Sequence, residues 1–415
     1  MFIIKIMMFS DPLMAGTGFS EEARNISYRL AQAGHEIFYI NNSIQFPIDL
    51  PDSIFPDLPQ KGAKIKVLGN FGSQENFGAE AAERYYSIYH PDLMFVFGDP
   101  HHIEPYLKLK KKCNLPLLHY TTLDGLPIYS DWKRLFDATD INVTITEWAM
   151  NEYRKQNFNI SAYIHHGINW QYFQTNNQTK QQLKQKYNLD GYTIFINWDV
   201  NQYRKRTDAL LRCWKDFNPL AKKAKLLLFT DFNCPIGWNL EAKIYEYGIP
   251  RETIISPYEL IGRDKLWGCA EEPWLIKEIG QLGDIYLSTT GGEGFGKALL
   301  EAMTLQLPVI ATDYSAIPEV LDKYGVLIPC YEGRAGRYQM HDAARHTELG
   351  VVNEEKFTEA MLYYFDHPAE RNELGAKANE WARMFDYDRQ IMVGWNQLLD
   401  QVNPDTMMAN SLLRS

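Results

Sequence analysis

The stretch TTGGEGFGKALLEAM, residues 289–303, follows the apolar run DIYLS and places an acid, Glu293, among four glycines. Apolar residues then recur at helical spacing, and a second acid, Glu301, lies eight positions after the first. This order predicts a strand, a glycine turn over residues 291–296, and a helix that begins near residue 295 or 296. Backbone N–H groups at a glycine turn into a helix favour an anion, so the stretch also predicts a binding site.

The rest of the chain repeats this alternation of short apolar runs and longer amphipathic ones. Strands that are apolar on both faces indicate parallel sheets covered on both sides by helices. The amide-rich stretch 174–190 interrupts the pattern, which resumes at Tyr192. We therefore predict an α/β chain with doubly wound domains at 1–173 and 174–385, and a terminal helix at 386–415 that crosses back to the first domain. Such pairs of domains bind ligands in the cleft between them, at the carboxyl ends of strands.

Composition excludes several other classes of protein. The chain has 415 residues, 52 of them acidic and 42 basic, and the net charge of −10 does not favour nucleic acid as a partner. Its five cysteines are scattered without a CxxC pair, which predicts no disulfide framework or zinc site and fits a reducing, cytoplasmic compartment. The apolar start is interpreted as a buried strand, not a signal peptide. No apolar run approaches the roughly 20 residues that span a bilayer, so we predict no transmembrane segment and leave peripheral membrane contact open.

The spacing of the two acids suggests what the site binds. With Glu293 in the turn and Glu301 in the helix, which rises about 1.5 Å per residue, the two acids are separated along the helix axis by roughly the length of a diphosphate with a sugar ring at each end. Carboxylates accept hydrogen bonds from pairs of sugar hydroxyls, so one acid for each sugar is a coherent arrangement. The alternative is that Glu301 pairs with Lys297 on a solvated helix face, which leaves Glu293 and its glycines unexplained.

These residues resemble the E-x7-E motif of the GT-B glycosyltransferases, in particular their large retaining family 4. The resemblance continues in LQLPVIATDYSAIPEVL, in GTGFSEEARNISYRLAQAGHE and in YIHHGINWQYF, so that together the pieces span most of the chain. It implies two Rossmann-like domains that face each other across a cleft, the first on the acceptor side and the second binding the nucleotide-sugar donor. It also implies that Glu301 holds the ribose, that Glu293 contacts the transferred sugar, and that Gly294, Phe295 and Gly296 line the donor site.

The resemblance implies a hexosyltransferase that moves a sugar from a nucleotide-diphosphate sugar, such as a UDP- or GDP-sugar, to an acceptor with retention of configuration. The acceptor, whether glycan, lipid or protein, stays open. No cofactor and no metal are expected, because basic side chains take the place of a metal at the leaving diphosphate. A sugar-nucleotide epimerase of the same fold and a non-catalytic nucleotide-sugar-binding protein are the alternatives.

The basic run Arg204-Lys205-Arg206 follows the first strand of the second predicted domain. A solvated charge run is the ordinary interpretation, but here the run lies at the carboxyl end of a strand in an acidic protein. Such groups would neutralise a leaving diphosphate. The family places an Arg and a Lys, five apart, in this loop. Lys205 matches the Lys, whereas Val200 stands where the Arg would be, so we expect Arg204 or Arg206 to substitute.

The first glycine loop is a weaker signal. Gly16 and Gly18 resemble the opening of a dinucleotide fingerprint, but Glu21 occupies the third glycine position, so NAD binding is not favoured. A flexible loop that borders the cleft is favoured, with Gly16 and Gly18 near the donor, and a purely structural turn is the alternative.

Polar groups also follow two strands of the first predicted domain. The resemblance implies that His119 or Asp124 is the group near the anomeric carbon, and with Glu293 and Lys205 they form the predicted catalytic set. Adjacent histidine side chains tend to point apart, so His101 and His102 are not expected to form a metal site. The DYD sequence at 386–388 resembles a metal-binding motif of another glycosyltransferase class, but it follows a helical pattern and is interpreted as structural.

Overall fold

The computed structural model describes residues 3–13, 15–41, 43–49, 65–71, 75–175, 177–263, 266, 273–339 and 347–402. The chain forms two compact units. Unit 1 comprises Met1–Leu123, Tyr129–Gly167 and Phe385–Ser415, and unit 2 comprises Asp124–Ile128 and Ile168–Met384. The short segment Asp124–Ile128 lies within the first predicted domain in sequence, yet it belongs to unit 2.

Unit 1 is built on an eight-stranded sheet in the order β3-β4-β2-β1-β5-β6-β7-β8, in which only β3 is antiparallel to its neighbour. The strands are β1 (Lys5–Phe9), β2 (Glu36–Asn41), β3 (Ile48–Asp49), β4 (Ile65–Gly69), β5 (Leu93–Phe97), β6 (Leu117–Thr121), β7 (Ile141–Thr144) and β8 (Ala162–Tyr163). The helices are α1 (Gly18–Gln32), α2 (Ala79–Tyr89), α3 (Glu104–Cys113), α4 (Lys133–Ala138), α5 (Glu147–Lys155) and α15 (Met392–Gln401).

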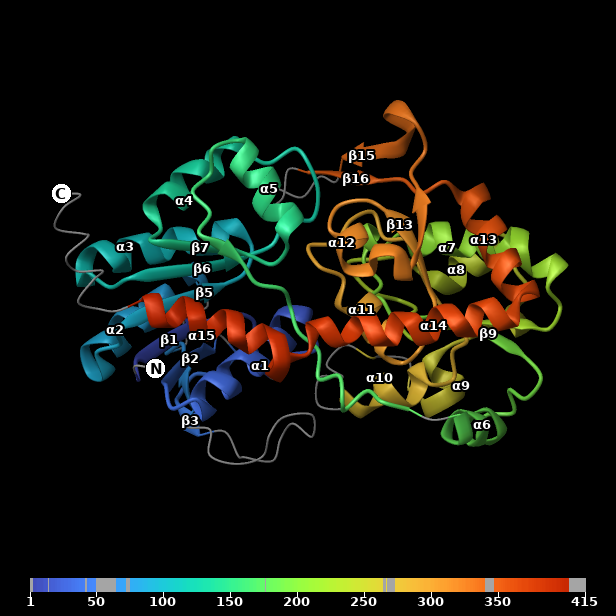
Figure 1. Ribbon diagram of the computed structural model, residues 1–415, viewed down its shortest axis with the longest axis horizontal. Helices are drawn as coiled ribbons and strands as arrows, with labels where there is room; N and C mark the ends of the chain where they lie inside the picture. Colours follow the sequence, from blue (N-terminus) through green and yellow to red (C-terminus); the bar gives the residue numbers. More distant parts are fainter. Residues whose placement is uncertain are drawn as a thin grey trace. The chain divides into compact units, whose positions relative to one another are not determined.

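Helices cover both faces of this sheet (Figure 1). Because side chains alternate along a strand, neighbouring residues of β6 face opposite helices. Tyr120 packs edge-on against Trp395 of α15, with 4.9 Å between ring centroids, whereas His119 packs against Phe136 of α4 at 5.5 Å. Burial on both faces explains why the strands of unit 1 read as continuous apolar runs.

Unit 2 is built on a six-stranded, fully parallel sheet in the order β11-β10-β9-β12-β13-β14. The strands are β9 (Thr193–Asn197), β10 (Ala224–Leu228), β11 (Ile254–Ile255), β12 (Ile285–Ser288), β13 (Val309–Asp313) and β14 (Val326–Pro329). The helices are α6 (Asn177–Lys186), α7 (Thr207–Phe217), α8 (Leu240–Glu246), α9 (Pro257–Ile261), α10 (Pro273–Gly280), α11 (Lys297–Thr304), α12 (Ile317–Leu321), α13 (Glu354–Asp366) and α14 (Pro368–Ala382).

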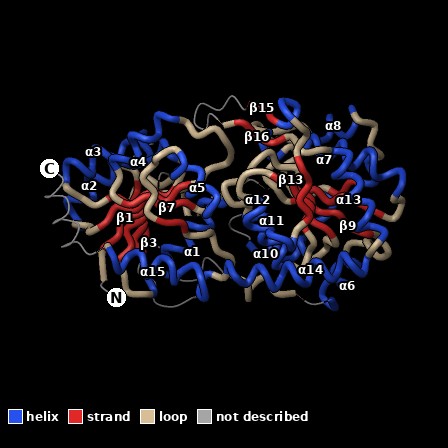
Figure 2. Tube along the Cα trace, turned by 45° about the horizontal axis from the view of Figure 1, so that its top comes forward, coloured by secondary structure: helices blue, strands red, loops and turns tan. Residues whose placement is uncertain are grey.

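Strands lie inside and helices outside in each unit, as Figure 2 shows. In unit 2 one buried cluster joins Trp214 of α7 and Phe357 of α13 to Leu287 of β12. A separate antiparallel pair, β15 (Arg337–Gln339) and β16 (Glu348–Gly350), adds to this unit, and Leu126 bridges to Glu348 of β16. The predicted fold class, two doubly wound α/β units, is confirmed.

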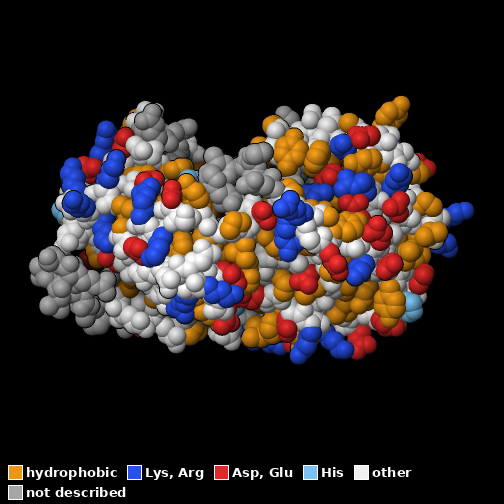
Figure 3. All heavy atoms as spheres, turned by 90° about the horizontal axis from the view of Figure 1, so that it is seen from above, with side chains coloured by type: hydrophobic (Ala, Val, Ile, Leu, Met, Phe, Trp, Pro, Cys, Tyr) orange, Lys and Arg blue, Asp and Glu red, His pale blue; other side chains and the backbone are white. Residues whose placement is uncertain are grey.

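Two further features of the structure are the distribution of charge on its surface and the length and polarity of its helices. Basic and acidic side chains are interspersed over the part of unit 2 that faces the viewer in Figure 3. Within the described residues, every helix is too short or too polar to cross a bilayer.

Candidate active site

The candidate site lies in unit 2 where the strand order reverses, between β9 and β12. In open α/β sheets, ligands bind at the carboxyl ends of strands at such a switch point. The loop after β9 ends in a short 3-10 turn, Tyr203–Lys205, and the loop after β12 is the glycine turn that precedes α11. The amide of Gly291 donates to the carbonyl of Arg204 at 2.8 Å, so the two loops are held together.

Glu293 is the centre of an ion cluster between these loops. Its Oε1 accepts hydrogen bonds from Lys205 Nζ at 2.6 Å and from the Thr290 hydroxyl at 2.8 Å. Its Oε2 lies 3.1 Å from Nη1 of Arg204, which also donates to the carbonyl of Gly292. The side chain is nearly enclosed, since Glu293 is only 6% exposed.

Two further acids extend the cluster. Asp199 Oδ1 lies 3.1 Å from Lys205 Nζ, and Asp199 Oδ2 accepts a hydrogen bond from the Ser288 hydroxyl at 2.7 Å. Asp124 Oδ2 lies 3.8 Å from Nε of Arg204. Two cations thus lie among three carboxylates, and each cation has acidic partners that an incoming anion would have to displace.

The charges of this cluster reinforce one another. Burial alone would raise the pKa of Glu293, but the charges of Arg204 and Lys205 outweigh it and lower that pKa to about 2. Burial would likewise lower the pKa of Lys205, but Asp199 and Glu293 outweigh it and raise that pKa above its usual value. The same balance, with Glu293 and Asp124 as the partners, raises the pKa of Arg204. The three central groups are therefore fully ionised at neutral pH.

Glycine is required at two positions of the turn. A Cβ on Gly292 would collide with the backbone carbonyl oxygen of Asp124. Gly296, the residue before α11, has φ of 96°, in the left-handed region that side chains disfavour. With glycine at these two positions, the turn can approach the Asp124–Ile128 segment and then continue into the helix. The prediction of a glycine turn followed by a helix that begins near residue 295 or 296 is confirmed, since α11 begins at Lys297.

Glu301 lies one turn into α11 and is only 8% exposed. Its Oε2 accepts a hydrogen bond from the indole Nε1 of Trp198 at 2.8 Å. The alternative interpretation, a solvated helix face, is therefore wrong for Glu301. Trp198 directly follows β9, so the loops on both sides of the switch point contribute to the surroundings of this carboxylate.

The structure separates the two arginines that were candidates beside Lys205. Arg204 joins the Glu293 cluster. Arg206 instead has its Nε 3.3 Å from Asp208 and its guanidinium 5.1 Å from the ring centre of Tyr338. Val200, at the position where the family has an arginine, is 39% exposed.

The predicted candidates His119, Gly16 and Gly18 lie in unit 1. His119 occupies the middle of β6 and is fully buried, because that strand continues to Thr121. Burial lowers the pKa of His119 to about 4, so the ring is neutral at pH 7. Gly16 and Gly18 are exposed on either side of Thr17, whose hydroxyl caps α1 by accepting from the amide of Ser20.

The expected orientation of the adjacent histidines His101 and His102 is wrong, whereas the interpretation of the DYD sequence at 386–388 is correct. The expectation that His101 and His102 point apart is wrong, because their ring centroids are 4.3 Å apart. The short turn that carries them brings successive side chains to one side. The structural interpretation of the DYD sequence is confirmed: Asp386 accepts from the amides of Asp388 and Arg389, and Asp388 pairs with Arg29 at 2.7 Å.

Sequence reasoning missed Asp199, Trp198 and Tyr338. The first two follow directly on β9 in the sequence NWDVN, so their position at the carboxyl end of a predicted strand was a usable signal. Tyr338 belongs to β15, far from the switch point in sequence, and nothing in its local pattern points to Arg206.

Comparison with known proteins finds a family model and solved structures that are similar to this chain. Residues 264–336, which contain the glycine turn and α11, match the family model described as glycosyl transferases group 1. Sucrose-phosphate synthase from Thermosynechococcus elongatus is a structural neighbour with a TM-score of 0.71 and 15% identity, over 96% of this chain and 99% of that one. No curated protein matches the sequence.

Two other solved structures are similar. Anabaena Alr3699/HepE in complex with UDP-glucose has a TM-score of 0.68 and 11% identity, over 96% of this chain and 98% of that one. A glycosyltransferase from Rickettsia africae ESF-5 has a TM-score of 0.68 and 13% identity, over 98% of this chain and 99% of that one. The family match over residues 264–336 and the fold shared with these structures support a glycosyltransferase of GT-B architecture. Within that class, the match is to glycosyl transferases group 1.

Proposed function

We propose that this protein transfers a hexose from a nucleotide-diphosphate sugar to an acceptor, with retention of configuration and without a metal ion. The observation that carries the proposal is the Glu293 carboxylate held between Lys205 and Arg204 at the start of α11. UDP is the favoured donor nucleotide, because the similar protein Alr3699/HepE has been solved in complex with UDP and with UDP-glucose.

In the proposed mechanism, the two cations of the cluster exchange their carboxylate partners for the diphosphate of the donor. When a diphosphate enters, Lys205 and Arg204 would turn from the carboxylates toward its oxygens, aided by the amides of Gly294 to Gly296 at the start of α11. Glu293 would then accept hydrogen bonds from hydroxyls of the transferred sugar. Glu301, already oriented by Trp198, would accept the ribose hydroxyls.

The proposed reaction needs no cofactor, because every bond broken and formed and the proton released are accounted for by donor and acceptor. The bond from the anomeric carbon to the diphosphate oxygen breaks, and the acceptor oxygen bonds to that carbon on the same face. The acceptor proton passes to the leaving phosphate oxygen, while Lys205 and Arg204 stabilise the charge that develops there. Asp124, beside Arg204, is the first-choice candidate near the sugar, since the burial of His119 in β6 disfavours the histidine.

Binding of donors tests the proposal first. We expect one nucleotide-sugar series among UDP-, GDP- and ADP-sugars to raise the melting temperature, because a ligand at 100-fold its Kd adds about 2.7 kcal/mol of stability. For a unit of this size that is a rise of roughly 5–10 °C. Glu301→Ala should lose about 10- to 150-fold in affinity for that nucleoside diphosphate, since charged hydrogen bonds are worth about 1.5–3 kcal/mol.

Glu373→Ala, which removes an exposed acid from α14, is the matched control and should bind the nucleotide as the unchanged protein does. Product analysis with labelled donor then separates the activities. Isomerised donor in the absence of any acceptor would point to an epimerase. Binding without turnover, over a broad panel of acceptors, would point to a nucleotide-sugar-binding protein.

Metal independence is a separate prediction. EDTA should leave the initial rate of transfer within about twofold, because Lys205 and Arg204 provide the positive charge that a metal ion would otherwise supply. Rates are compared before chelation, after it, and after re-addition of Mg²⁺ or Mn²⁺. A rate that collapses with EDTA and returns with either ion would contradict the proposed mechanism.

A further inference from the structure

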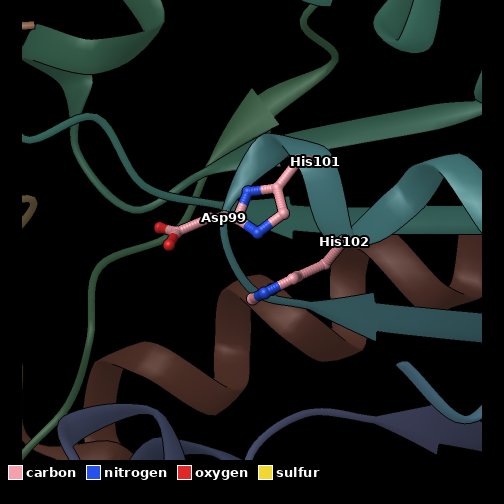
Figure 4. Close-up of side chains that lie close together, drawn as sticks. All are labelled: Asp99, His101 and His102. Atoms are coloured by element: carbon pink, nitrogen blue, oxygen red, sulfur yellow. The ribbon is translucent and has the colours of Figure 1, made fainter. Parts of the chain in front are cut away.

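A second group of side chains that can bind a ligand lies in unit 1 and shares no residue with the candidate active site. Asp99, His101 and His102 follow β5 in the sequence DPHH, and one ligand atom from each lies within 4.8 Å of the other two. Both rings project from the short turn Pro100–Ile103 toward the side on which the Asp99 carboxylate lies (Figure 4). All three side chains are half-buried.

The position of this group matches a place where open α/β sheets bind ligands. The strand order of unit 1 reverses between β1 and β5, and the three residues follow the carboxyl end of β5. It is the counterpart, within unit 1, of the switch point that holds the Glu293 cluster in unit 2.

The surrounding packing fixes the histidines. The ring of His102 lies against Phe77, with centroids 4.5 Å apart, and edge-on to Phe9 at 6.4 Å. The ring of His101 also contacts Phe77, at 5.5 Å. Gly98 allows this arrangement, because a Cβ there would collide with Nδ1 of His102. Aromatic contacts and the missing side chain therefore hold both imidazoles beside the carboxylate.

We propose that Asp99, His101 and His102 bind a divalent transition-metal ion, with Zn²⁺ as the best match. Two imidazoles and one carboxylate suit Zn²⁺, Co²⁺ and Ni²⁺, whereas Mg²⁺ and Ca²⁺ prefer sites made of oxygen ligands alone. Three protein ligands leave a fourth position for water or for an oxygen of a bound molecule.

The distances between the three ligand atoms indicate how far the side chains would have to move to bind a zinc ion. Ligands about 2.0–2.2 Å from a tetrahedral zinc ion lie about 3.3–3.6 Å from one another. The present separations are at most 4.8 Å, so the ligand atoms would have to approach one another by up to about 1.5 Å to close the site. The ligands of this ion belong to unit 1 and are different residues from Lys205 and Arg204, which neutralise the diphosphate in the proposed mechanism.

Calorimetry on the full chain, stripped with EDTA and freed of chelator, tests the proposal. We expect one Zn²⁺ per chain, and Mg²⁺ at the same concentrations should give no comparable binding. His101→Ala and His102→Ala should each weaken Zn²⁺ binding by at least about tenfold, because the loss of groups that merely support metal ligands already costs 10- to 100-fold. Co²⁺ should give visible absorption that both variants lose.

Matched controls separate this site from adventitious binding. His367→Ala removes an exposed histidine of unit 2, and Cys113→Ser removes a half-buried thiol of unit 1. Neither should change Zn²⁺ affinity. Gly98→Ala keeps all three ligands but displaces His102, so it should weaken binding while circular dichroism shows an intact fold. Equal Zn²⁺ affinity in the unchanged protein and in the His101→Ala/His102→Ala double variant would overturn the proposal.

Discussion

Replacing Lys205 with methionine should lower kcat for sugar transfer by about 100- to 1000-fold, the loss seen when one preorganised donor to a developing oxyanion is removed. Lys205 lies 2.6 Å from Glu293 and 3.1 Å from Asp199, and these acids keep it charged inside a buried site. Negative charge on the leaving diphosphate grows as the bond breaks, so the loss should fall more on kcat than on donor KM. Steady-state kinetics with the identified donor measure both.

Arg206→Met is the matched control for this variant. It removes a positive charge only one residue away, but Arg206 faces Asp208 and Tyr338 rather than Glu293. We expect an effect of less than about tenfold on kcat, because a group outside the cluster stabilises the leaving group only weakly. Equal losses from the two substitutions would mean that the basic run acts as a general positive patch.

Glu293→Gln should separate catalysis from nucleotide binding. Loss of charged hydrogen bonds to the transferred sugar, worth about 1.5–3 kcal/mol, should lower kcat by about 10- to 150-fold. Affinity for the free nucleoside diphosphate should be equal or higher, because Glu293 no longer competes with the diphosphate for Lys205 and Arg204. Calorimetry with the nucleoside diphosphate, alongside donor kinetics, gives the two quantities.

The same substitution should have a distinctive effect on stability. Removing one partner of a buried ion pair costs about 3–5 kcal/mol, so the melting temperature of Glu293→Gln should fall and bound nucleoside diphosphate should restore much of it. In the unchanged protein the pKa of Glu293 is lowered to about 2. Its ionic contribution to stability is therefore present above pH 4.5 and lost as the pH falls toward 2, a dependence that the variant should lack.

Asp208→Asn is the control for these effects. Asp208 is also buried and also pairs with two arginines, Arg206 at 3.3 Å and Arg212 at 2.9 Å, but it lies outside the Glu293 cluster. It should lose stability, and bound nucleotide should raise its melting temperature only by as much as it raises that of the unchanged protein. If Glu293→Gln lost affinity for nucleoside diphosphate while Glu301→Ala kept it, the roles proposed for the two acids would be reversed.

The sequence by itself determined the local architecture of the site. Alternating apolar runs predicted two doubly wound sheets, because parallel strands covered on both faces must be apolar throughout. The glycine turn and the start of α11 could be located because few residues tolerate the φ of Gly296. The i to i+8 spacing placed Glu293 and Glu301 on one turn-helix unit without reference to any other part of the chain.

Only the tertiary structure decided which groups meet at that unit. Asp124 follows β6 of unit 1 in sequence but packs with unit 2, where the bare backbone of Gly292 lets the Asp124 carbonyl approach and Arg204 lies beside its carboxylate. Arg204 and Arg206 flank Lys205 in the sequence. The turn between β9 and α7 decides that Arg204, and not Arg206, contacts Glu293. Sequence spacing carries no information on such choices.

The positions of three histidines also could not be predicted from the sequence. His119 has the sequence position of a site residue, yet β6 continues past it and its side chain alternates toward α4, so it is buried. His101 and His102 were expected to diverge, yet a short turn and the contact with Phe77 bring their rings together. A strand's end, a turn's geometry and a neighbour's packing are set by contacts between distant residues, and those contacts exist only once the chain has folded.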